Sequence, residues 1–178
     1  MNPVPLKLVF TGPVGSGKTT ALHQLSDIPP VVTEQVMTVG ATADKTTTTV
    51  ALDYGEVTLD DGSKVFLFGT PGQRYYDYMC KIVAKGAAGI MLLLNDESVD
   101  PQRDLGYFTE LFADHAQRGA MVLGVTHIES ARHDPLRRYN EWLAKRGFMF
   151  PVFAVDARSR EDVILMVEAL SASLEYTN

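Results

Sequence analysis

One eight-residue segment, GPVGSGKT at residues 12–19, constrains the fold of this chain more than any other part of the sequence. It satisfies the pattern G-x-x-x-x-G-K-[S/T] and stands between an apolar run, LKLVFT at residues 6–11, and a helix-like stretch at residues 17–25. Glycines in such a segment let backbone N–H groups turn inward around phosphate oxygens at the start of a helix. The segment therefore predicts a strand, a phosphate-binding loop and a helix in succession; a glycine-rich turn that merely starts a helix is the competing interpretation.

Strand-like and helix-like segments alternate along the rest of the chain. Apolar runs at residues 50–59, 63–68, 89–94, 120–126 and 150–155 predict strands, and the turn DDG at residues 60–62 predicts that the first two pair antiparallel. Helices are predicted at residues 74–85, 101–118, 135–146 and 161–175, and residues 40–49, GATADKTTTT, indicate a mobile loop. This order predicts one three-layer α/β P-loop domain over residues 1–178. Its six-stranded mixed sheet should be mostly parallel, with one antiparallel edge strand.

Composition and charge exclude several classes of protein. The net charge of −6 gives no overall basic field for nucleic acid or an anionic membrane. A single cysteine, Cys80, excludes a disulfide framework and a cysteine-based zinc site. The start of the chain lacks a secretory apolar core, and the most apolar run, residues 87–94, is too short to span a bilayer. We therefore expect a cytoplasmic protein with no direct membrane anchor and no nucleic-acid partner.

The phosphate loop assigns chemistry to its own residues. Lys18 is expected to reach the β- and γ-phosphates of a nucleotide, and the Thr19 hydroxyl to ligate Mg²⁺. Val14 places a branched side chain close to where the γ-phosphate and its attacking water would lie, which favours slow unaided hydrolysis. The predicted phosphate-binding residues are Gly12, Val14, Gly15, Ser16, Gly17, Lys18, Thr19 and Thr20.

With these segments placed, the chain resembles a Ras-like small GTPase over nearly its whole length. TVALDY at residues 49–54 is similar to the family's first-switch pattern T-I-G-V-D-F, and GTPGQ at residues 69–73 is similar to its second-switch pattern D-x-x-G-Q. The resemblance implies that Thr49 and Thr19 hold Mg²⁺, with Thr48 as the other possible register and a solvated β-edge as the alternative. It also implies that Gly72 bonds the γ-phosphate and that Gln73, acting with Lys18, orients the attacking water. GTP, GDP and Mg²⁺ are the implied ligands.

The second switch departs from the family in one residue. Gly69 stands where the family has an Asp that helps to hold Mg²⁺, so weaker magnesium binding is expected, and Asp96 is a candidate for a compensating charge. A T-x-P-G-Q switch without this Asp is similar to a bacterial branch of small GTPases that includes gliding-motility and cell-polarity proteins, which work with Roadblock-type partners. The resemblance implies a regulatory partner of this type.

That partner is expected to dock near residues 75–79, because aromatic side chains and Met are favoured at the centres of interfaces. The residues concerned are Tyr75, Tyr76, Tyr78 and Met79. No arginine lies between Lys18 and Gln73. A partner is therefore expected to supply a charge or to reposition Gln73.

Two further segments stand where the family reads the base. THIE at residues 126–129 replaces N-K-x-D, and DAR at residues 156–158 replaces S-A-K. The resemblance implies that Glu129 accepts the N–H groups of guanine, that His127 covers the base by stacking and that Thr126 replaces some of the Asn hydrogen bonds. It also implies that the Ala157 N–H reads the guanine carbonyl oxygen, with Asp156 and Arg158 beside it. A polar loop without base contact remains the alternative.

These residues together predict a GTP-binding molecular switch that slowly hydrolyses GTP to GDP and phosphate with the help of a partner. Two other classes remain open. One is a nucleotide-stabilised binding or scaffold module with little or no hydrolysis. The other is a different P-loop enzyme, such as a small kinase or an NTPase with relaxed or adenine base specificity.

Overall fold

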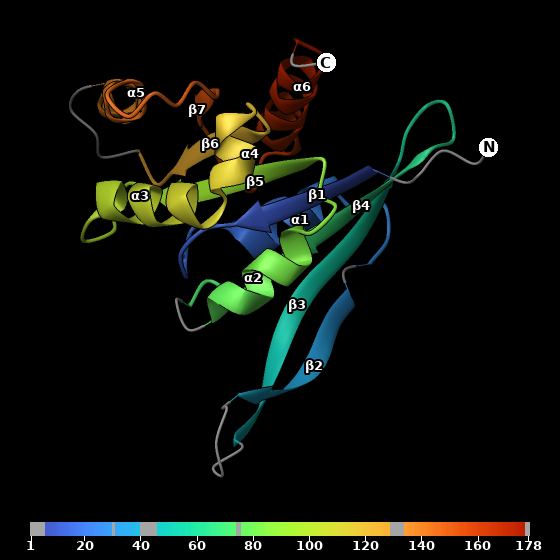
Figure 1. Cartoon of the computed structure of the whole chain (residues 1–178). Coiled ribbons are helices and arrows are strands. Elements are labelled where there is room, and N and C mark those ends of the chain that lie inside the picture. Colours follow the sequence, from blue (N-terminus) through green and yellow to red (C-terminus); the bar gives the residue numbers. More distant parts are fainter. Residues whose placement is uncertain (1–5, 30, 40–45, 74–75, 129–133, 177–178) are drawn as a thin grey trace.

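The computed structural model describes residues 6–29, 31–39, 46–73, 76–128 and 134–176, with only the backbone course for residues 32–39, 46–51, 135 and 176. Within these residues one sheet is formed in the order β2-β3-β4-β1-β5-β6-β7 (Figure 1). Only β3 runs against the direction of the other strands. The strands are β1 Leu6–Thr11, β2 Val31–Val39, β3 Thr46–Thr58, β4 Lys64–Gly69, β5 Gly89–Asn95, β6 Met121–Thr126 and β7 Val152–Ala154.

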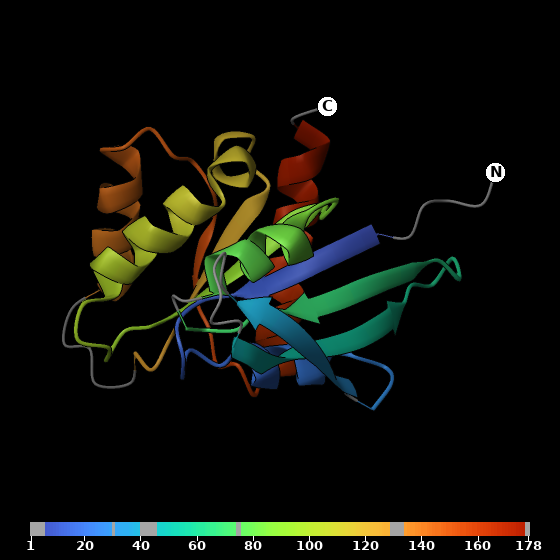
Figure 2. The same cartoon turned by 60° about the horizontal axis from the view of Figure 1, so that its bottom comes forward.

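Helices cover both faces of this sheet, as Figures 1 and 2 show from two directions. They are α1 Lys18–Leu25, α2 Asp77–Ala84, α3 Pro101–Leu111, α4 Ala113–Gln117, α5 Pro135–Ala144 and α6 Arg160–Tyr176. Alternate strand residues enter two separate cores: Leu8 and Phe10 of β1 pack with side chains of α1 and α6, whereas Val9 packs with side chains of α2 to α5. This period-two burial creates the two apolar layers. The predicted three-layer α/β P-loop fold is confirmed.

The edge of the sheet differs from the prediction. A further strand, β2, pairs antiparallel with β3 and takes the edge position, so that β3 lies between β2 and β4. The prediction of a mobile loop at residues 40–49 is wrong for residues 46–49, which belong to β3. Residues 40–45 lie outside the described part of the chain. Val and Thr dominate both segments, and such β-branched side chains favour the extended backbone of a strand. The small, polar character of the threonine tract is typical of a loop, but the β-branched side chains favour the strand that forms.

A second difference lies in the helix predicted at residues 101–118. It divides into α3 and α4 at Phe112, whose backbone (φ −114°, ψ 35°) leaves the helical region while its side chain is buried. The predicted antiparallel pairing across the DDG turn is confirmed, with a register that places Asp53 opposite Gly69.

The sheet topology brings four loops to one edge. Strand β1 lies between β4 and β5, so the chain order reverses on its two sides. In sheets of this kind ligands bind outside the carboxyl ends of the strands at such a reversal. The loops that follow β1, β5, β6 and β7 all leave the sheet at this carboxyl edge.

Candidate functional site

The phosphate loop connects β1 to α1 and depends on glycines for its shape. Gly12 (φ 141°), Gly15 (φ 78°) and Gly17 (φ 92°) all have the positive φ that glycine adopts without strain. A Cβ at position 12 would lie 2.0 Å from the carbonyl oxygen of Leu93, and one at position 17 would lie 2.8 Å from Cβ of Ala157. Glycine at positions 12 and 17 therefore lets the loop pass close to both β5 and the loop after β7.

Lys18, the first residue of α1, places a cation inside this loop. Its Nζ donates a hydrogen bond to the Pro13 carbonyl oxygen at 2.7 Å. Burial lowers the pKa of Lys18 to about 8, against the charges of Asp53 and Cys80, which raise it. A desolvated ammonium enclosed by backbone is suited to bind a multiply charged anion, because the anion would replace the lost hydration of the cation.

Thr19 contacts the carboxylate of Asp53, a residue for which the sequence patterns predicted no role. The Thr19 hydroxyl donates to Oδ2 of Asp53 at 2.5 Å. Asp53 lies on β3 directly opposite Gly69 of β4, and a Cβ at position 69 would lie 3.0 Å from Cβ of Asp53 and 3.1 Å from its Oδ2. Gly69 thus leaves the space that the Asp53 side chain occupies. The carboxylate missing from β4 is supplied by the neighbouring strand.

Asp96, the compensating residue considered from the sequence, is engaged elsewhere. Its carboxylate accepts hydrogen bonds from Arg138 and from the Tyr139 hydroxyl of α5, the latter at 2.7 Å. These bonds tie the end of β5 to α5. The geometry therefore favours Asp53 over Asp96 as the charge beside Thr19.

Thr49 lies away from this pair. It belongs to β3, where its backbone pairs with Val36 of β2, and it precedes Asp53 by four residues. At a strand rise of about 3.3 Å per residue, Thr49 lies roughly 13 Å further along the strand than Asp53. Its neighbour Thr48 pairs with Met37 and lies further still.

The second-switch segment begins at a fixed position against the phosphate loop. The Thr70 hydroxyl bonds the Thr11 hydroxyl at 2.9 Å, and the Thr70 N–H donates to the Phe10 carbonyl oxygen. Two residues on, a Cβ at Gly72 would lie 2.6 Å from the Val14 nitrogen and 2.8 Å from Lys18 Nζ. Only glycine fits this approach.

The two side chains expected nearest the γ-phosphate are turned outward. Gln73 is exposed, and the Val14 side chain is 69% exposed, so it projects to solvent. In this arrangement neither side chain closes over the loop.

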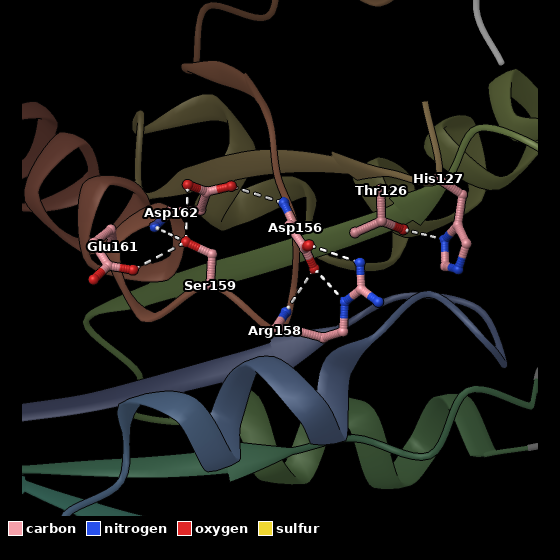
Figure 3. Close-up of polar contacts among 7 residues, drawn as sticks. All are labelled: Thr126, His127, Asp156, Arg158, Ser159, Glu161 and Asp162. Atoms are coloured by element: carbon pink, nitrogen blue, oxygen red, sulfur yellow. Dashed lines mark hydrogen bonds and ion pairs between the residues drawn. The ribbon is translucent and has the colours of Figure 1, made fainter. Parts of the chain in front are cut away.

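The base-side residues come from the loops after β6 and β7, and Figure 3 shows their polar contacts. The Thr126 hydroxyl is buried within 3.2 Å of the Ser16 carbonyl oxygen and 3.1 Å of the Leu94 carbonyl oxygen, and it lies 2.9 Å from Nδ1 of His127. His127 has φ 58°, an uncommon conformation for a residue other than glycine. Thr126 therefore links the phosphate loop to the exposed imidazole of His127, a residue whose backbone conformation is strained.

The DAR segment folds back on itself. Oδ1 of Asp156 accepts from the Arg158 backbone N–H and from its Nε, and Oδ2 accepts from a terminal guanidinium nitrogen at 2.8 Å (Figure 3). These bonds to Arg158 hold the pKa of Asp156 at about 2. The Asp156 N–H donates to Asp162 near the start of α6, and the Ser159 hydroxyl bonds Asp162 in turn.

One cavity of about 730 Å³ joins the phosphate and base sides. The predicted residues that line it are Gly15, Gly17, Lys18, Thr19, Thr20, Thr126, His127, Asp156, Ala157 and Arg158. It is also lined by Glu97, Ile128 and Asp162, which the sequence analysis did not assign. Glu129, the predicted guanine acceptor, lies outside the described residues.

The expected partner surface on α2 is divided by the structure. Tyr78 is 71% exposed and Ile82, one turn later, is 47% exposed. Met79 is buried, and Tyr76 packs against the core with it. Tyr75 lies outside the described residues. Only the outer face of α2 is thus available for a partner.

The described residues hold neither a metal cluster nor a membrane-spanning helix. They contain no group of three His, Cys, Asp or Glu side chains arranged to hold a metal ion. None of their helices is both long and apolar enough to cross a membrane.

The fold matches that of a solved structure. The G domain of the T. maritima FeoB iron transporter superposes with a TM-score of 0.64, covering 96% of this chain and 99% of that one at 18% sequence identity. At this identity the likeness shows the fold alone. The chain therefore has the P-loop fold of a G domain.

A comparison of sequences adds a relative. Uncharacterized protein MJ1339 of Methanocaldococcus jannaschii is 33% identical over 90 residues. The aligned region spans about half of each protein, 51% of this chain and 51% of the relative. No protein-family model matches the sequence.

Proposed function

We propose that this chain is a small G domain that binds GTP and GDP with Mg²⁺ and acts as a molecular switch. The observation that carries the proposal is the hydrogen bond between Thr19 and Asp53, beside a complete phosphate loop. In P-loop proteins the loop Ser or Thr and a nearby carboxylate hold the magnesium ion. Here both parts are present, although the carboxylate comes from a different strand than the family pattern implies.

The residues around Thr19 fit a magnesium ion. Mg²⁺ prefers hard oxygen ligands and usually takes one or two protein ligands plus phosphate oxygens and water. Thr19 would supply the ligand hydroxyl, and Asp53 would accept the proton of that hydroxyl. When bound, the ion would neutralise charge on the β- and γ-phosphate oxygens. A role for Thr49 would require residues 46–51 of β3 to change their course when GTP binds.

Hydrolysis is proposed to be slow without a partner. Gln73 is exposed, and no arginine lies between Lys18 and Gln73 to stabilise charge in the transition state. An arginine supplied by a partner is worth roughly 10³ to 10⁵ in rate in related reactions. We place the partner on the outer face of α2, which presents Tyr78 and Ile82, and a Roadblock-type protein is the class that the second-switch motif favours.

Single-turnover hydrolysis of GTP tests this function, with wild type and Gln73→Leu compared at saturating Mg²⁺. Wild type should turn over slowly, and Gln73→Leu should be slower by at least tenfold while it still binds GTP. Arg137→Ala, on the exposed face of α5, is the control and should match wild type. Tight binding without turnover, even with the cognate partner, would instead identify a nucleotide-stabilised binding module.

A further inference from the structure

The second switch reaches the phosphate loop at the point where a third phosphate would bind. A Cβ at Gly72 would lie 2.6 Å from the backbone nitrogen of Val14 and 2.8 Å from Nζ of Lys18. Both of these groups belong to the phosphate loop, and Lys18 is the residue expected to reach the γ-phosphate. Lys18 lines the nucleotide cavity, whereas Val14 and Gly72 do not. The backbone at Gly72 therefore occupies the position that a γ-phosphate would need.

The segment that carries Gly72 is held at its start by β1. The Thr70 hydroxyl bonds the Thr11 hydroxyl at 2.9 Å, and the Thr70 N–H donates to the Phe10 carbonyl oxygen at 2.9 Å. Thr70 and Thr11 are both buried, so water does not compete for these bonds. The backbone therefore leaves β4 in a fixed direction toward the phosphate loop.

The same segment is held at its end by α3. Helix α2 begins at Asp77, and the Asp77 carboxylate accepts a hydrogen bond from the Tyr107 hydroxyl of α3. Both helices cover the same face of the sheet and share one core (Figures 1 and 2). One turn into α2, Cys80 is buried with its Sγ 3.9 Å from the Pro71 carbonyl oxygen. Only residues 71–76 separate the two anchors, so releasing either anchor lets this segment shift.

The Tyr107 hydroxyl can be removed while the ring stays in place. The ring packs edge-on against Phe108, with the ring centroids 5.0 Å apart, and against the core that α2 and α3 share. A hydrogen bond to a charged group changes an equilibrium by roughly tenfold to a hundredfold. Loss of the hydroxyl alone should therefore release the second switch without disturbing the packing of α3.

We propose that Tyr107 is a positioning residue that, through Asp77, holds the second switch over the γ-phosphate position. In this arrangement the domain accepts a nucleoside diphosphate, but the switch must be released before a triphosphate fits. The apparent affinity for a triphosphate is then reduced by the fraction of molecules in which the switch is released. The inference rests on the proposed binding of a nucleotide at this site. It goes further because it assigns the choice between GDP and GTP to a bond between α2 and α3.

Equilibrium binding of GDP and of a non-hydrolysable GTP analogue, both with Mg²⁺, tests the proposal. Wild type should bind GDP roughly tenfold more tightly than the analogue. Tyr107→Phe should reduce this ratio by about fivefold or more, through tighter binding of the analogue with the GDP affinity unchanged. Asp77→Ala removes the same bond, so it should change the ratio as Tyr107→Phe does, and the double variant should change it no further.

Tyr139→Phe is the matched control for the loss of a tyrosine hydroxyl. The Tyr139 hydroxyl also donates to a carboxylate, that of Asp96 at 2.7 Å, but this bond joins α5 to the end of β5. Tyr139→Phe should lower the thermal stability and leave the ratio of the two affinities at the wild-type value. A purely structural role of Tyr107 would give the same result as this control, with lower stability and an unchanged ratio.

Each other outcome has a definite meaning. Equal binding of GDP and the analogue by wild type would overturn the proposal, and so would a wild-type ratio in Tyr107→Phe. Additive effects of Tyr107→Phe and Asp77→Ala would also overturn it, because the two residues would then not act through one bond. A change of the ratio in Tyr139→Phe as large as that in Tyr107→Phe would overturn it as well. Failure of wild type to bind either nucleotide would instead refute the proposed function.

Discussion

At the scale of single residues, Asp53 and Gly69 behave as one unit. They lie opposite each other on β3 and β4, and only the absence of a side chain at position 69 leaves room for the carboxylate that Thr19 contacts. Asp53 thus places a carboxylate beside Thr19, and Gly69 has no side chain that would displace it. The glycine at position 69 therefore does not indicate a defective site, because it makes room for the Asp53 carboxylate.

Asp53→Asn should weaken magnesium binding by about tenfold to a hundredfold, because it replaces the carboxylate beside Thr19 with a neutral amide and so removes the negative charge next to the ion. The measurement is a Mg²⁺ titration of GDP affinity. The double variant Asp53→Gly with Gly69→Asp returns the carboxylate to β4 and should recover part of the loss. If Asp53→Asn leaves the magnesium dependence unchanged, Asp53 has no role at the ion.

The lowered pKa of Lys18 predicts that both folding and phosphate binding depend on pH. Its pKa of about 8 lies below the ordinary value of 10.5, so the unfolded chain binds more protons between those two values. Burial of the charged lysine thus opposes folding below about pH 8, and this cost disappears as the pH rises toward 10.5. Phosphate binding favours the charged form and should reverse the shift.

Nucleotide affinity should therefore fall as the pH rises above about 8, with uptake of up to one proton on binding. Calorimetry of GDP binding at pH 7 and pH 9, in buffers of different ionisation enthalpy, measures the uptake. It should be close to zero for Lys18 at pH 7 and should approach one at pH 9. Lys18→Arg, which stays charged, should show no such increase; an increase that persists in this variant would assign the linkage to another group.

At the scale of elements, the start of α6 controls the base side of the site. Ser159 and Asp162 bond each other reciprocally, as in a capping box, and Asp162 also holds the Asp156 N–H. The cap of a helix therefore fixes the turn that carries Arg158. Helix α6, which carries none of the predicted motifs, therefore helps to hold the base side of the site in place.

Ser159→Ala should destabilise the domain by about 1 kcal/mol, the usual effect of losing an N-cap side chain. Urea unfolding measures the change. Ser171→Ala, at an exposed position inside α6, is the matched control and should be neutral or slightly stabilising, because alanine is the better helix former. Equal effects of the two substitutions would show that Ser159 does not cap the helix.

The β2–β3 hairpin is the element that the proposed switch must move. Thr49 pairs with Val36 in this hairpin, about 13 Å along the strand from Asp53. Amide hydrogen exchange at residues 46–50 should therefore differ between the GDP complex and a complex with a non-hydrolysable GTP analogue. Amides of β1 and β5 in the core should exchange equally in the two complexes. Identical exchange throughout residues 46–50 would remove Thr49 from the switch.

At the scale of the whole molecule, the alternation of segments and the single complete motif were enough to predict the fold. They identified the phosphate loop and the antiparallel hairpin. The role of Asp53 could not be read from a motif, because it depends on the register between two strands. That register was nonetheless within reach: residues 53 and 69 are equally distant from Asp61 at the centre of the predicted DDG turn.

Other parts of the site were beyond sequence reasoning for a different reason. Asp156 and Arg158 are two residues apart, and nothing in their spacing shows that the carboxylate turns back onto the guanidinium. Glu97 and Asp162 reach the cavity from the β5–α3 loop and from α6, which only the assembled sheet brings together. The threonines at residues 46–49 are small and polar, as in many loops, yet their β-branched side chains extend β3, and β2 pairs with that extension.

We propose that this domain holds a guanine nucleotide together with Mg²⁺. The most direct measurement is to incubate the protein with an equimolar mixture of GDP and ADP, remove free nucleotide by gel filtration, denature the protein and identify what was bound. Close to one guanine nucleotide per chain should be recovered in the presence of Mg²⁺, and much less with EDTA. Recovery of adenine nucleotide in its place, or of no nucleotide under either condition, would contradict it.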